Sequence, residues 1–366
     1  MDNFKYLMPT KCYVGDNCIK NHGKEISCIG KKALIVTGRR SSKENGSLDD
    51  VVDTLKSLDI SYVIFDEVEE NPSLETVDKA SNIGIEEKVD FIIGIGGGSP
   101  IDASKAIAVL INNKEYNAFN FIGASHLEGV PVIAVPTTAG TGTEVTQYAI
   151  VTDHKEKTKK NIGHSVFPKL AFIDPKYMEN MSYKNTVSTA LDAFSHLAEA
   201  YLNSNANILS DLYCEKGIEI FGGCISRLLN KVLDNKLRED LMMVSTLGGM
   251  AIAQVATSLP HGMGYALTYN KGVSHGLANT ILYKEYFNAF KNKERVEKII
   301  QLMKLSSLED FGNILDNLIN VDIKVTEDEL RDYAKDMAKN AGKLKNHPEE
   351  IGEEELFNIY KKSLIK

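Results

Sequence analysis

The chain has no apolar run long enough to cross a membrane. Among its 366 residues the longest apolar stretches, such as 91–95 and 130–135, have the length of a β-strand. A membrane-spanning helix needs about 20 apolar residues. The first ten residues contain no apolar core of signal-peptide length. We therefore expect a cytoplasmic protein with no membrane partner.

Cysteine is scarce, and basic residues form no continuous block. The five cysteines are an odd number without a C-x-x-C pair, which in a chain of this length is typical of reduced thiols rather than of a disulfide framework. The 42 basic residues are outnumbered by 50 acidic ones, and the net charge is −8. This balance argues against nucleic acid as a partner. Internal repeats and low-complexity segments are also missing, and 43% hydrophobic residues is ordinary for a globular protein.

The first half of the chain alternates strand-like and helix-like patterns. The strand-like runs are residues 33–37, 61–65, 91–95 and 130–135. Helical patterns lie between them, one expected to begin with Ser47 as its N-cap and another after residues 71–73. Alternation of this kind predicts a mostly parallel sheet, and nearly continuous apolar strands predict helices on both of its faces.

The second half contains no strand-like run. Residues after about 185 carry apolar side chains at three- and four-residue spacing, which predicts helices, with breaks at Gly312 and around 342–348. The predicted fold class is therefore an α/β N-terminal nucleotide-binding domain at 1–185, followed by an all-α C-terminal domain at 186–366.

A glycine-rich turn follows the third predicted strand. The segment FIIGIGGGSPID (91–102) places three glycines before Ser99, a suitable N-cap, and Pro100, which suits the first helical position. Glycines let the backbone approach a pyrophosphate, and the N–H groups of the helix end then face it. No lysine follows as in a Walker loop, and an ordinary strand-to-helix turn stays an alternative. The acid at Asp102 would repel phosphate, so it should face a neutral or cationic part of a ligand.

A threonine-rich loop follows the next strand. The segment VPTTAGTGTEVT (135–146) carries five hydroxyls, from Thr137, Thr138, Thr141, Thr143 and Thr146. Because it leaves the same sheet beside the glycine-rich turn, a ligand shared by both loops is favoured over a merely solvated loop.

The end of the first strand indicates which dinucleotide binds. In many dinucleotide sites an acid at this point bonds the adenosine ribose. Here the strand ends at Gly38, followed by Arg39, Arg40 and Ser41. A missing acid with guanidinium and hydroxyl donors nearby suits a 2′-phosphate, which favours NADP(H) while NAD stays possible.

Four potential metal ligands lie far apart in the sequence. Asp192 and His196 are four residues apart on one predicted helix face, and His261 and His275 are each followed by glycine. One carboxylate and three imidazoles can close a four-ligand site for a divalent ion. The ligand types suit iron or zinc, Fe²⁺ or Zn²⁺, and do not choose between them.

Taken together these motifs resemble the iron-containing (group III) alcohol dehydrogenases, which share a fold with glycerol dehydrogenase and dehydroquinate synthase. The segments that carry the resemblance are ALIVTG, GGGSPID, PTTAGTGTEVT, LAFIDP, LDAFSH and the two His-Gly sites. They occur in the family's order over most of the chain. The resemblance implies a dehydroquinate synthase-like fold.

The resemblance also implies roles for particular residues. It implies that the catalytic metal is bound by Asp192, His196, His261 and His275. It implies that the cofactor contacts Gly38, Arg39, Ser41, Asn71, Gly97, Gly98, Ser99, Asp102, Thr137, Thr138, Thr141, Thr146 and a lysine after the threonine-rich loop. Of the two candidates for that lysine, Lys159 and Lys160, we prefer Lys160. Tyr265 replaces a histidine that many members carry, and Tyr265, His164 or water is the candidate proton relay.

The implied function is a metal-dependent NADP(H) alcohol dehydrogenase and aldehyde reductase. Its substrate would be a small primary alcohol or aldehyde. The alternatives are a zinc-dependent NAD polyol dehydrogenase of the glycerol type, a lyase of the dehydroquinate synthase type, and a catalytically silent NADP-binding sensor. An edge strand near the N-terminus would make a homodimer natural.

Overall fold

The computed structural model describes residues 3–365 and divides the chain into two compact units. The α/β unit is Met8–Met181, and the helical unit runs from Ser182 onward. The predicted boundary lies a few residues later and assigns the N-terminal segment to the α/β half. In the structure residues 3–7 belong with the helical unit, because the Leu7 backbone N–H and C=O both bond the side-chain amide of Gln254 at 3.0 Å.

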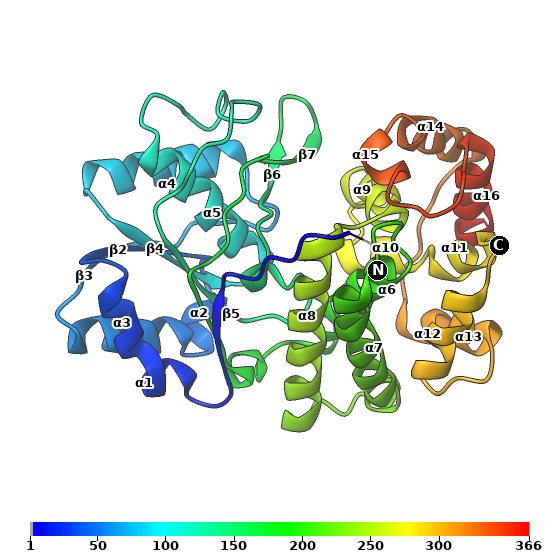
Figure 1. Cartoon of the computed structure of the whole chain (residues 1–366), viewed down its shortest axis with the longest axis horizontal. Helices are drawn as coiled ribbons and strands as arrows, with labels where there is room; N and C mark the ends of the chain where they lie inside the picture. The colour runs from blue at the N-terminus through cyan, green and yellow to red at the C-terminus, as the bar shows by residue number, and fades with distance from the viewer. Residues whose placement is uncertain (1–2, 366) are drawn as a thin grey trace. The chain divides into compact units, whose positions relative to one another are not determined.

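The α/β unit is built on a six-stranded parallel sheet with the order β1-β8-β5-β4-β2-β3. Strands β2, β3, β4 and β5 of this sheet are labelled in Figure 1. Its strands are β1 (Lys11–Val14), β2 (Lys32–Thr37), β3 (Ser61–Phe65), β4 (Phe91–Gly96), β5 (Val132–Pro136) and β8 (Leu170–Ile173). Strands β6 (Ile150–Asp153) and β7 (Thr158–Asn161) form a separate antiparallel hairpin. The parallel sheet confirms the predicted fold class. The edge strand β1 pairs with β8 alone within the described residues, and the homodimer stays a prediction.

Helices cover both faces of this sheet. They are α1 (Cys18–His22), α2 (Ser41–Glu44), α3 (Ser47–Ser57), α4 (Leu74–Glu86) and α5 (Gly98–Asn112), with 3₁₀ turns η1 (Gly23–Cys28), η2 (Thr143–Val145) and η3 (Pro175–Met178). Successive side chains of a strand point to opposite faces. Leu34 and Val36 of β2 therefore join the core under α4 and α5, whereas Ala33 and Ile35 join the core under α1 and α3. Burial on both faces explains the continuous apolar runs.

Two predicted helix starts are wrong by one or two residues. Helix α5 begins at Gly98 with Gly97 as its cap, and the Ser99 hydroxyl accepts the backbone N–H of Asn71 instead of capping. Helix α3 begins at Ser47 itself, after Gly46 in the left-handed conformation (φ 79°), and the Ser47 hydroxyl donates to the Asn45 side chain. In both places a glycine supplies the turn, so the serine is available for another contact.

The helical unit contains no strand among its described residues, as predicted. Its helices are α6 (Tyr183–Tyr201), α7 (Ile208–Leu229), α8 (Asn235–Val255), α9 (Leu259–Lys271), α10 (His275–Thr280), α11 (Tyr283–Ala289), α12 (Glu294–Leu302), α13 (Leu308–Leu318), α14 (Glu327–Met337), α15 (Ala341–Leu344) and α16 (Glu353–Leu364). The break predicted at Gly312 is wrong, because Gly312 lies inside α13. A Cβ there would stand 2.6 Å from Cδ of Lys284, so the glycine permits close packing against α11.

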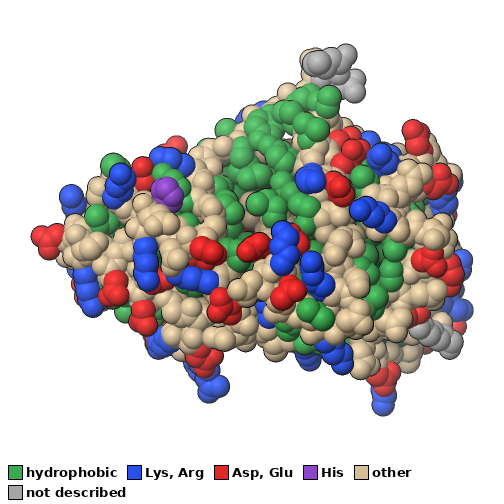
Figure 2. Space-filling model, turned by 90° about the horizontal axis from the view of Figure 1, so that it is seen from below, with side chains coloured by type: hydrophobic (Ala, Val, Ile, Leu, Met, Phe, Trp, Pro, Cys, Tyr) green, Lys and Arg blue, Asp and Glu red, His purple; other side chains and the backbone are tan. Residues whose placement is uncertain are grey.

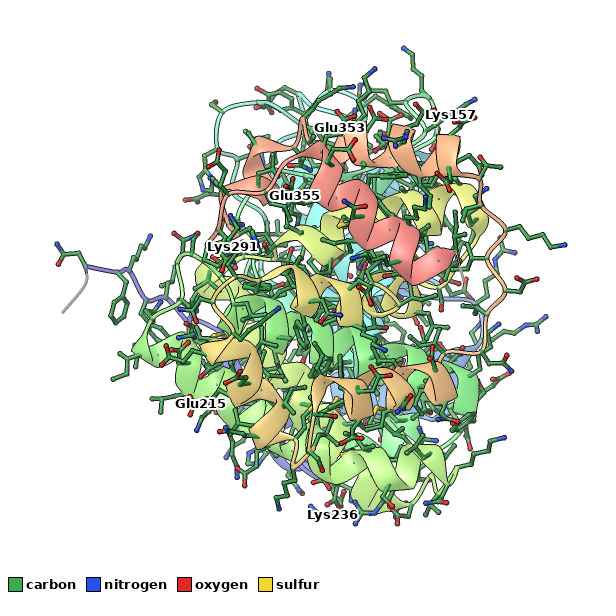
Figure 3. All side chains as sticks on the ribbon, turned by 90° about the vertical axis from the view of Figure 1, so that its right-hand side faces the viewer. Lys157, Glu215, Lys236, Lys291, Glu353 and Glu355 are labelled. Atoms are coloured by element: carbon green, nitrogen blue, oxygen red, sulfur yellow. The ribbon has the colours of Figure 1, made fainter. Side chains whose placement is uncertain are left out.

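Many charged side chains of this unit lie on its outside. In Figure 3 the side chains of Lys236, Lys291 and Glu353 project away from the packed helices. On the face shown in Figure 2 acidic and basic side chains are intermixed. Among the described residues no single helix is long and apolar enough to span a membrane, and α8 with α9 meets those limits only as a pair bent by 112°.

Candidate active site

Three predicted cofactor segments meet at one edge of the parallel sheet. Strand β4 lies between β2 and β5, with Thr37 opposite Ile95 and Gly96 opposite Pro136. Gly38, the glycine-rich turn and Thr137 therefore follow neighbouring strand ends. The carboxyl edge of an open parallel sheet is where α/β proteins bind dinucleotides.

The glycine-rich turn and the threonine-rich loop are in van der Waals contact. The backbone N–H of Thr137 donates to the Gly96 carbonyl at 2.9 Å. A Cβ at Gly97 would lie 2.9 Å from the hydroxyl oxygen of Thr138, and one at Gly98 would lie 2.8 Å from the methyl carbon of Thr141. Only glycine permits this approach, so the two loops form one surface at the start of α5, where unpaired backbone N–H groups favour an anion.

Asn71 lies beside the same turn. Its backbone N–H donates to the Ser99 hydroxyl at 3.0 Å, and its carbonyl accepts the Thr152 hydroxyl at 3.0 Å. Its φ of 59° is left-handed, a conformation that asparagine tolerates better than most residues. The structure thus brings Asn71 to the glycine-rich turn, as the resemblance implied.

The end of β2 carries no acid but has room for one. Gly38 is half-buried, while Arg39, Arg40 and Ser41 are exposed. A Cβ at Gly38 would meet only the Val68 carbonyl oxygen, at 3.4 Å, and its φ lies outside the left-handed region. The absence of a carboxylate here is therefore not forced by packing.

The two candidate lysines after the threonine-rich loop, Lys159 and Lys160, are neighbours on β7. The Lys160 ammonium pairs with Asp153 at 2.9 Å and with Glu156 at 2.6 Å across the β6–β7 hairpin. Burial raises the pKa of Asp102, and the positive charges of Lys105 and Lys159 oppose that rise. The Lys160 ammonium is paired with Asp153 and Glu156, and both lysines stay candidates for the cofactor contact.

Asp102 and Thr146 form hydrogen bonds with other residues of the α/β unit. Asp102 accepts the Thr143 hydroxyl at 2.5 Å and the Ile150 backbone N–H at 2.9 Å. Thr146 is buried, and its carbonyl accepts from the Lys105 ammonium at 2.9 Å. The direct cofactor contacts expected of Asp102 and Thr146 stay predictions.

Three helices bring the predicted metal ligands together. Helix α6, capped by Ser182, carries Asp192 and His196, while α9 carries His261 and α10 begins at His275. A Cβ at Gly276 would stand only 1.9 Å from the Ser188 carbonyl oxygen. The glycine after His275 is thus required for α10 to contact α6.

The ligand atoms converge around Asp192. Oδ1 of Asp192 lies 3.7 Å from Nε2 of His261 and 3.9 Å from Nε2 of His275. The ring of His196 stacks on that of His261 with 4.5 Å between centroids. Asp192, His196 and His261 are each at most 5% exposed. All four residues predicted from their spacing therefore lie in one small region of the helical unit.

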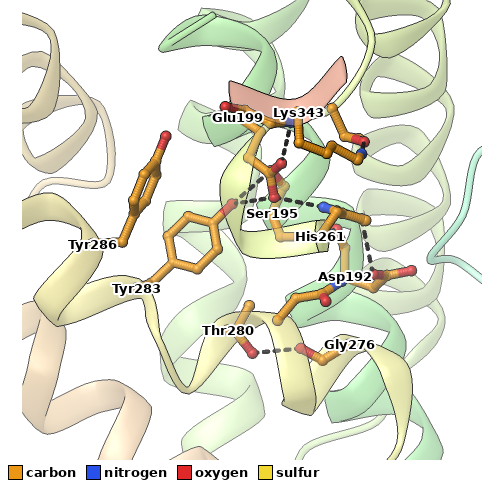
Figure 4. A network of polar contacts seen from close by, with 12 residues as sticks. Asp192, Ser195, Glu199, His261, Gly276, Thr280, Tyr283, Tyr286 and Lys343 are labelled. Carbon is orange, nitrogen blue, oxygen red and sulfur yellow. Dashed lines mark hydrogen bonds and ion pairs between the residues drawn. The ribbon is translucent and has the colours of Figure 1, made fainter. Parts of the chain in front are cut away.

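Sequence reasoning missed Glu199, which bonds the far side of His261 (Figure 4). Its Oε1 lies 2.5 Å from Nδ1 of His261 and accepts the Tyr283 hydroxyl at 3.2 Å, while Oε2 accepts the Ser258 backbone N–H at 2.5 Å. A carboxylate at Nδ1 keeps the proton there and leaves Nε2 as the electron-pair donor. The signal was present, since Glu199 follows His196 by three residues on the same face of α6.

The charges at the site favour the ligand forms of these side chains. Burial lowers the pKa of His261 far below its usual value, and the neighbouring His196 adds to this, so the imidazole is neutral. Burial alone would raise the pKa of Asp192, but His196, His275 and His261 outweigh it, and the pKa is lowered. A neutral imidazole and an ionised carboxylate are the forms that bind a metal.

Asp192, His261 and His275 fit a divalent cation, since each offers a ligand atom within 4.8 Å of the others. Nε2 of His261 is buried and has no hydrogen-bond partner within residues 3–365, a costly state for a polar atom. Its 3.7 Å distance from Asp192 Oδ1 is too long for a hydrogen bond. Two ligand atoms that share one tetrahedral ion lie about 3.4 Å apart, so a small shift accommodates the metal.

Comparison with known proteins decides the family. A model described as iron-containing alcohol dehydrogenase matches residues 9–175, and the C-terminal model of the same family matches 186–364. The chain belongs to the iron-containing alcohol dehydrogenase family. It is therefore an oxidoreductase of the alcohol dehydrogenase type, and the family binds iron and NAD(H) or NADP(H), as the resemblance implied.

Named relatives of this alcohol dehydrogenase align with most of its length. It is 29% identical to the 1,3-propanediol dehydrogenase of Citrobacter freundii over 98% of both chains. It is 30% identical to the NADPH-dependent butanol dehydrogenase of Clostridium saccharobutylicum over 87% of this chain and 82% of that one. The crystal structure of an iron-containing alcohol dehydrogenase from Thermotoga maritima matches with a TM-score of 0.90 and 37% identity over 99% of each chain.

The two candidate relay residues of this alcohol dehydrogenase lie in different surroundings. Nδ1 of His164 accepts the Leu127 backbone N–H at 3.2 Å, and its Nε2 lies 2.9 Å from the Phe121 carbonyl oxygen. His164 is buried, and these two contacts connect it to the segment 121–127 of the α/β unit. Tyr265 lies at the ligand cluster, its ring stacked on that of His275 with 5.5 Å between centroids. Of the two, Tyr265 lies beside a predicted metal ligand, and the relay role stays a prediction.

Glu199→Gln is expected to weaken metal binding by about 10- to 100-fold while leaving the fold intact. Glutamine keeps the size of the side chain but removes the negative charge beside Nδ1 of His261. The measurement is the metal dissociation constant of apo-protein titrated with Zn²⁺. The matched control is Glu219→Gln, which removes a charge from the exposed surface of the same unit. Equal affinities for the two variants would contradict the role assigned to Glu199.

Proposed function

We propose that this chain is an NADP(H)-dependent aldehyde reductase and primary-alcohol dehydrogenase that uses a divalent metal, with iron as the preferred ion. It transfers a hydride reversibly between the nicotinamide and a small primary alcohol or aldehyde. The observation that carries the cofactor choice is the end of β2, where Gly38 leaves the ribose without a carboxylate and Arg39, Arg40 and Ser41 offer donors to a 2′-phosphate. The similarity to an NADPH-dependent butanol dehydrogenase supports it.

In this proposal the cofactor lies on the surface formed by the glycine-rich turn and the threonine-rich loop. The backbone N–H groups at the start of α5 receive the pyrophosphate. Asn71 and Thr138 line the same place, since both contact the glycine-rich turn through backbone or side-chain atoms. The cofactor lysine is Lys159 or Lys160 of β7. Each of these groups positions the dinucleotide and none takes part in bond making.

Asp192, His196, His261 and His275 would hold the cation in this proposal. A bound Fe²⁺ or Zn²⁺ supplies Lewis acidity, which lowers the pKa of an alcohol. Glu199 keeps His261 in the tautomer that binds, and the burial of Asp192, His196 and His261 limits the access of water. Tyr265, whose ring stacks on that of His275, is the side chain proposed to exchange the substrate proton.

The test is an anaerobic assay of NADPH consumption with butyraldehyde, using metal-stripped protein reloaded with Fe²⁺, Zn²⁺ or Mg²⁺. We expect turnover with Fe²⁺, none with Mg²⁺, and a lower KM for NADPH than for NADH. Activity confined to NADH, Zn²⁺ and glycerol would show the polyol dehydrogenase instead. Cofactor binding without turnover under any of these conditions would indicate the silent sensor.

A further inference from the structure

Helix α5 contains a lysine with no exposed surface. Lys105 is 0% exposed, and its ammonium donates to the carbonyl oxygens of Thr143 at 2.7 Å, Thr146 at 2.9 Å and Tyr148 at 2.8 Å. It also bonds the Thr143 hydroxyl at 2.7 Å. A buried ammonium is costly unless it is fully hydrogen-bonded. Here every partner comes from one stretch, residues 143–148, at the end of the threonine-rich loop.

Asp102 lies one turn earlier on the same helix and bonds the same stretch. It accepts the Thr143 hydroxyl at 2.5 Å and the Ile150 backbone N–H at 2.9 Å. The Thr143 hydroxyl thus accepts from Lys105 and donates to Asp102. Burial lowers the pKa of Lys105 to about 8, and the negative charges of Asp102 and Glu144 oppose that effect. The two opposite charges therefore reduce the cost of burying each other.

The hydrogen bonds of Asp102 and Lys105 connect the two segments that form the candidate cofactor surface. The helix that carries Asp102 and Lys105 begins at Gly98, and the loop that they hold packs its Thr138 and Thr141 side chains against Gly97 and Gly98. The glycine-rich turn and the threonine-rich loop are consequently fixed to each other through α5. No other ion pair or metal is needed for this arrangement.

We propose that Asp102, Thr143 and Lys105 form a positioning triad that holds the threonine-rich loop against the glycine-rich turn and thereby preorganises the binding of a nicotinamide dinucleotide. The proposal rests on the proposed function for the identity of the ligand. It departs from the expectation that Asp102 touches the cofactor, because both of its oxygens are bonded to the loop. A loop ordered before binding costs less conformational entropy when the ligand arrives.

Thr143 offers the cleanest test, because its hydroxyl joins both charges while the residue itself is not among the expected cofactor contacts. Thr143→Val removes the hydroxyl at nearly constant volume, and Thr143→Ser retains it. Thr158→Val makes the same chemical change at an exposed position of the same unit. A hydrogen bond to a charged group corresponds to a factor of about 10 to 100 in an equilibrium constant.

Two measurements on each variant decide the matter. Amide hydrogen exchange of the cofactor-free protein reports the order of peptides within 137–150. Titration of the protein into NADPH, followed by the fluorescence of the NADPH, reports the dissociation constant. For Thr143→Val we expect exchange in that loop to rise about tenfold and NADPH affinity to fall about tenfold, with unchanged metal content. Thr143→Ser and Thr158→Val should stay within about twofold of the wild type.

The outcomes separate this inference from the proposed function. A wild-type protein that binds neither NADPH nor NADH would overturn the proposed function and with it the cofactor part of the triad's role. In that case amide hydrogen exchange within 137–150 would still show whether the triad orders the threonine-rich loop. If the wild type binds NADPH and Thr143→Val binds it equally well, the positioning role is wrong. A rise in exchange spread evenly over the α/β unit would show a purely structural residue and would also overturn the inference.

Discussion

The double variant His261→Ala, His275→Ala is expected to bind no metal and to lose about a thousandfold or more in dehydrogenase activity. Two of the four ligands disappear, and Asp192 and His196 alone cannot fix a catalytic cation. The loss corresponds to several kcal/mol of transition-state stabilisation that a Lewis acid provides. Metal content by mass spectrometry and kcat/KM for butyraldehyde are measured on the same preparation.

The control for this variant is His126→Ala, His154→Ala. Both histidines are exposed in the α/β unit, so the same number of imidazoles is lost outside the ligand cluster. We expect this control to retain its metal and its activity. If instead the variant at 261 and 275 kept both, the ligand assignment would be wrong.

Gly38→Asp is expected to shift cofactor preference from NADP(H) towards NAD(H) by about 10- to 100-fold. A carboxylate at the end of β2 repels a 2′-phosphate and accepts the ribose hydroxyls of NAD(H). The substitution fits the backbone, since the new Cβ meets only the Val68 carbonyl oxygen at 3.4 Å. The measured quantity is the ratio of kcat/KM for the two reduced cofactors.

Gly38→Ala separates charge from size in this experiment. It introduces the same Cβ without a carboxylate and should leave the cofactor ratio within about threefold of the wild type. An unchanged ratio in Gly38→Asp would remove the argument for a 2′-phosphate. An equal shift in both variants would assign the effect to crowding rather than to charge.

The parts of the fold that sequence predicted are those with strong periodicity. Strands β2, β3, β4 and β5 are apolar runs with two buried faces or a clear turn at each end, and α6 to α8 have long helical patterns. The strands β1 and β8 have four residues each, too few for a periodic signal, and become strands by pairing with their neighbours, β1 with β8 and β8 with β5. The hairpin strand β7, with sequence TKKN, carries no apolar pattern at all.

The metal ligands were predictable for a different reason than the cofactor contacts. A carboxylate and a histidine four residues apart must share a helix face, and the His-Gly pairs are explained by α10 packing on the backbone of α6. For Asp102 and Thr146 residue type alone could not show their hydrogen bonds within the protein, because the partners are about 40 or more residues away in the sequence. Glu199 was overlooked since its partner, Nδ1 of His261, lies 62 residues further along the chain.

The most direct test of the metal centre is a crystal structure of the reloaded protein with anomalous scattering recorded at the iron and zinc absorption edges. One peak per chain is expected, within about 2.3 Å of ligand atoms from Asp192, His196, His261 and His275. A peak bound by other residues would contradict the assignment. The assignment would also be wrong if the protein turned over butyraldehyde and these four side chains were ordered without a metal between them.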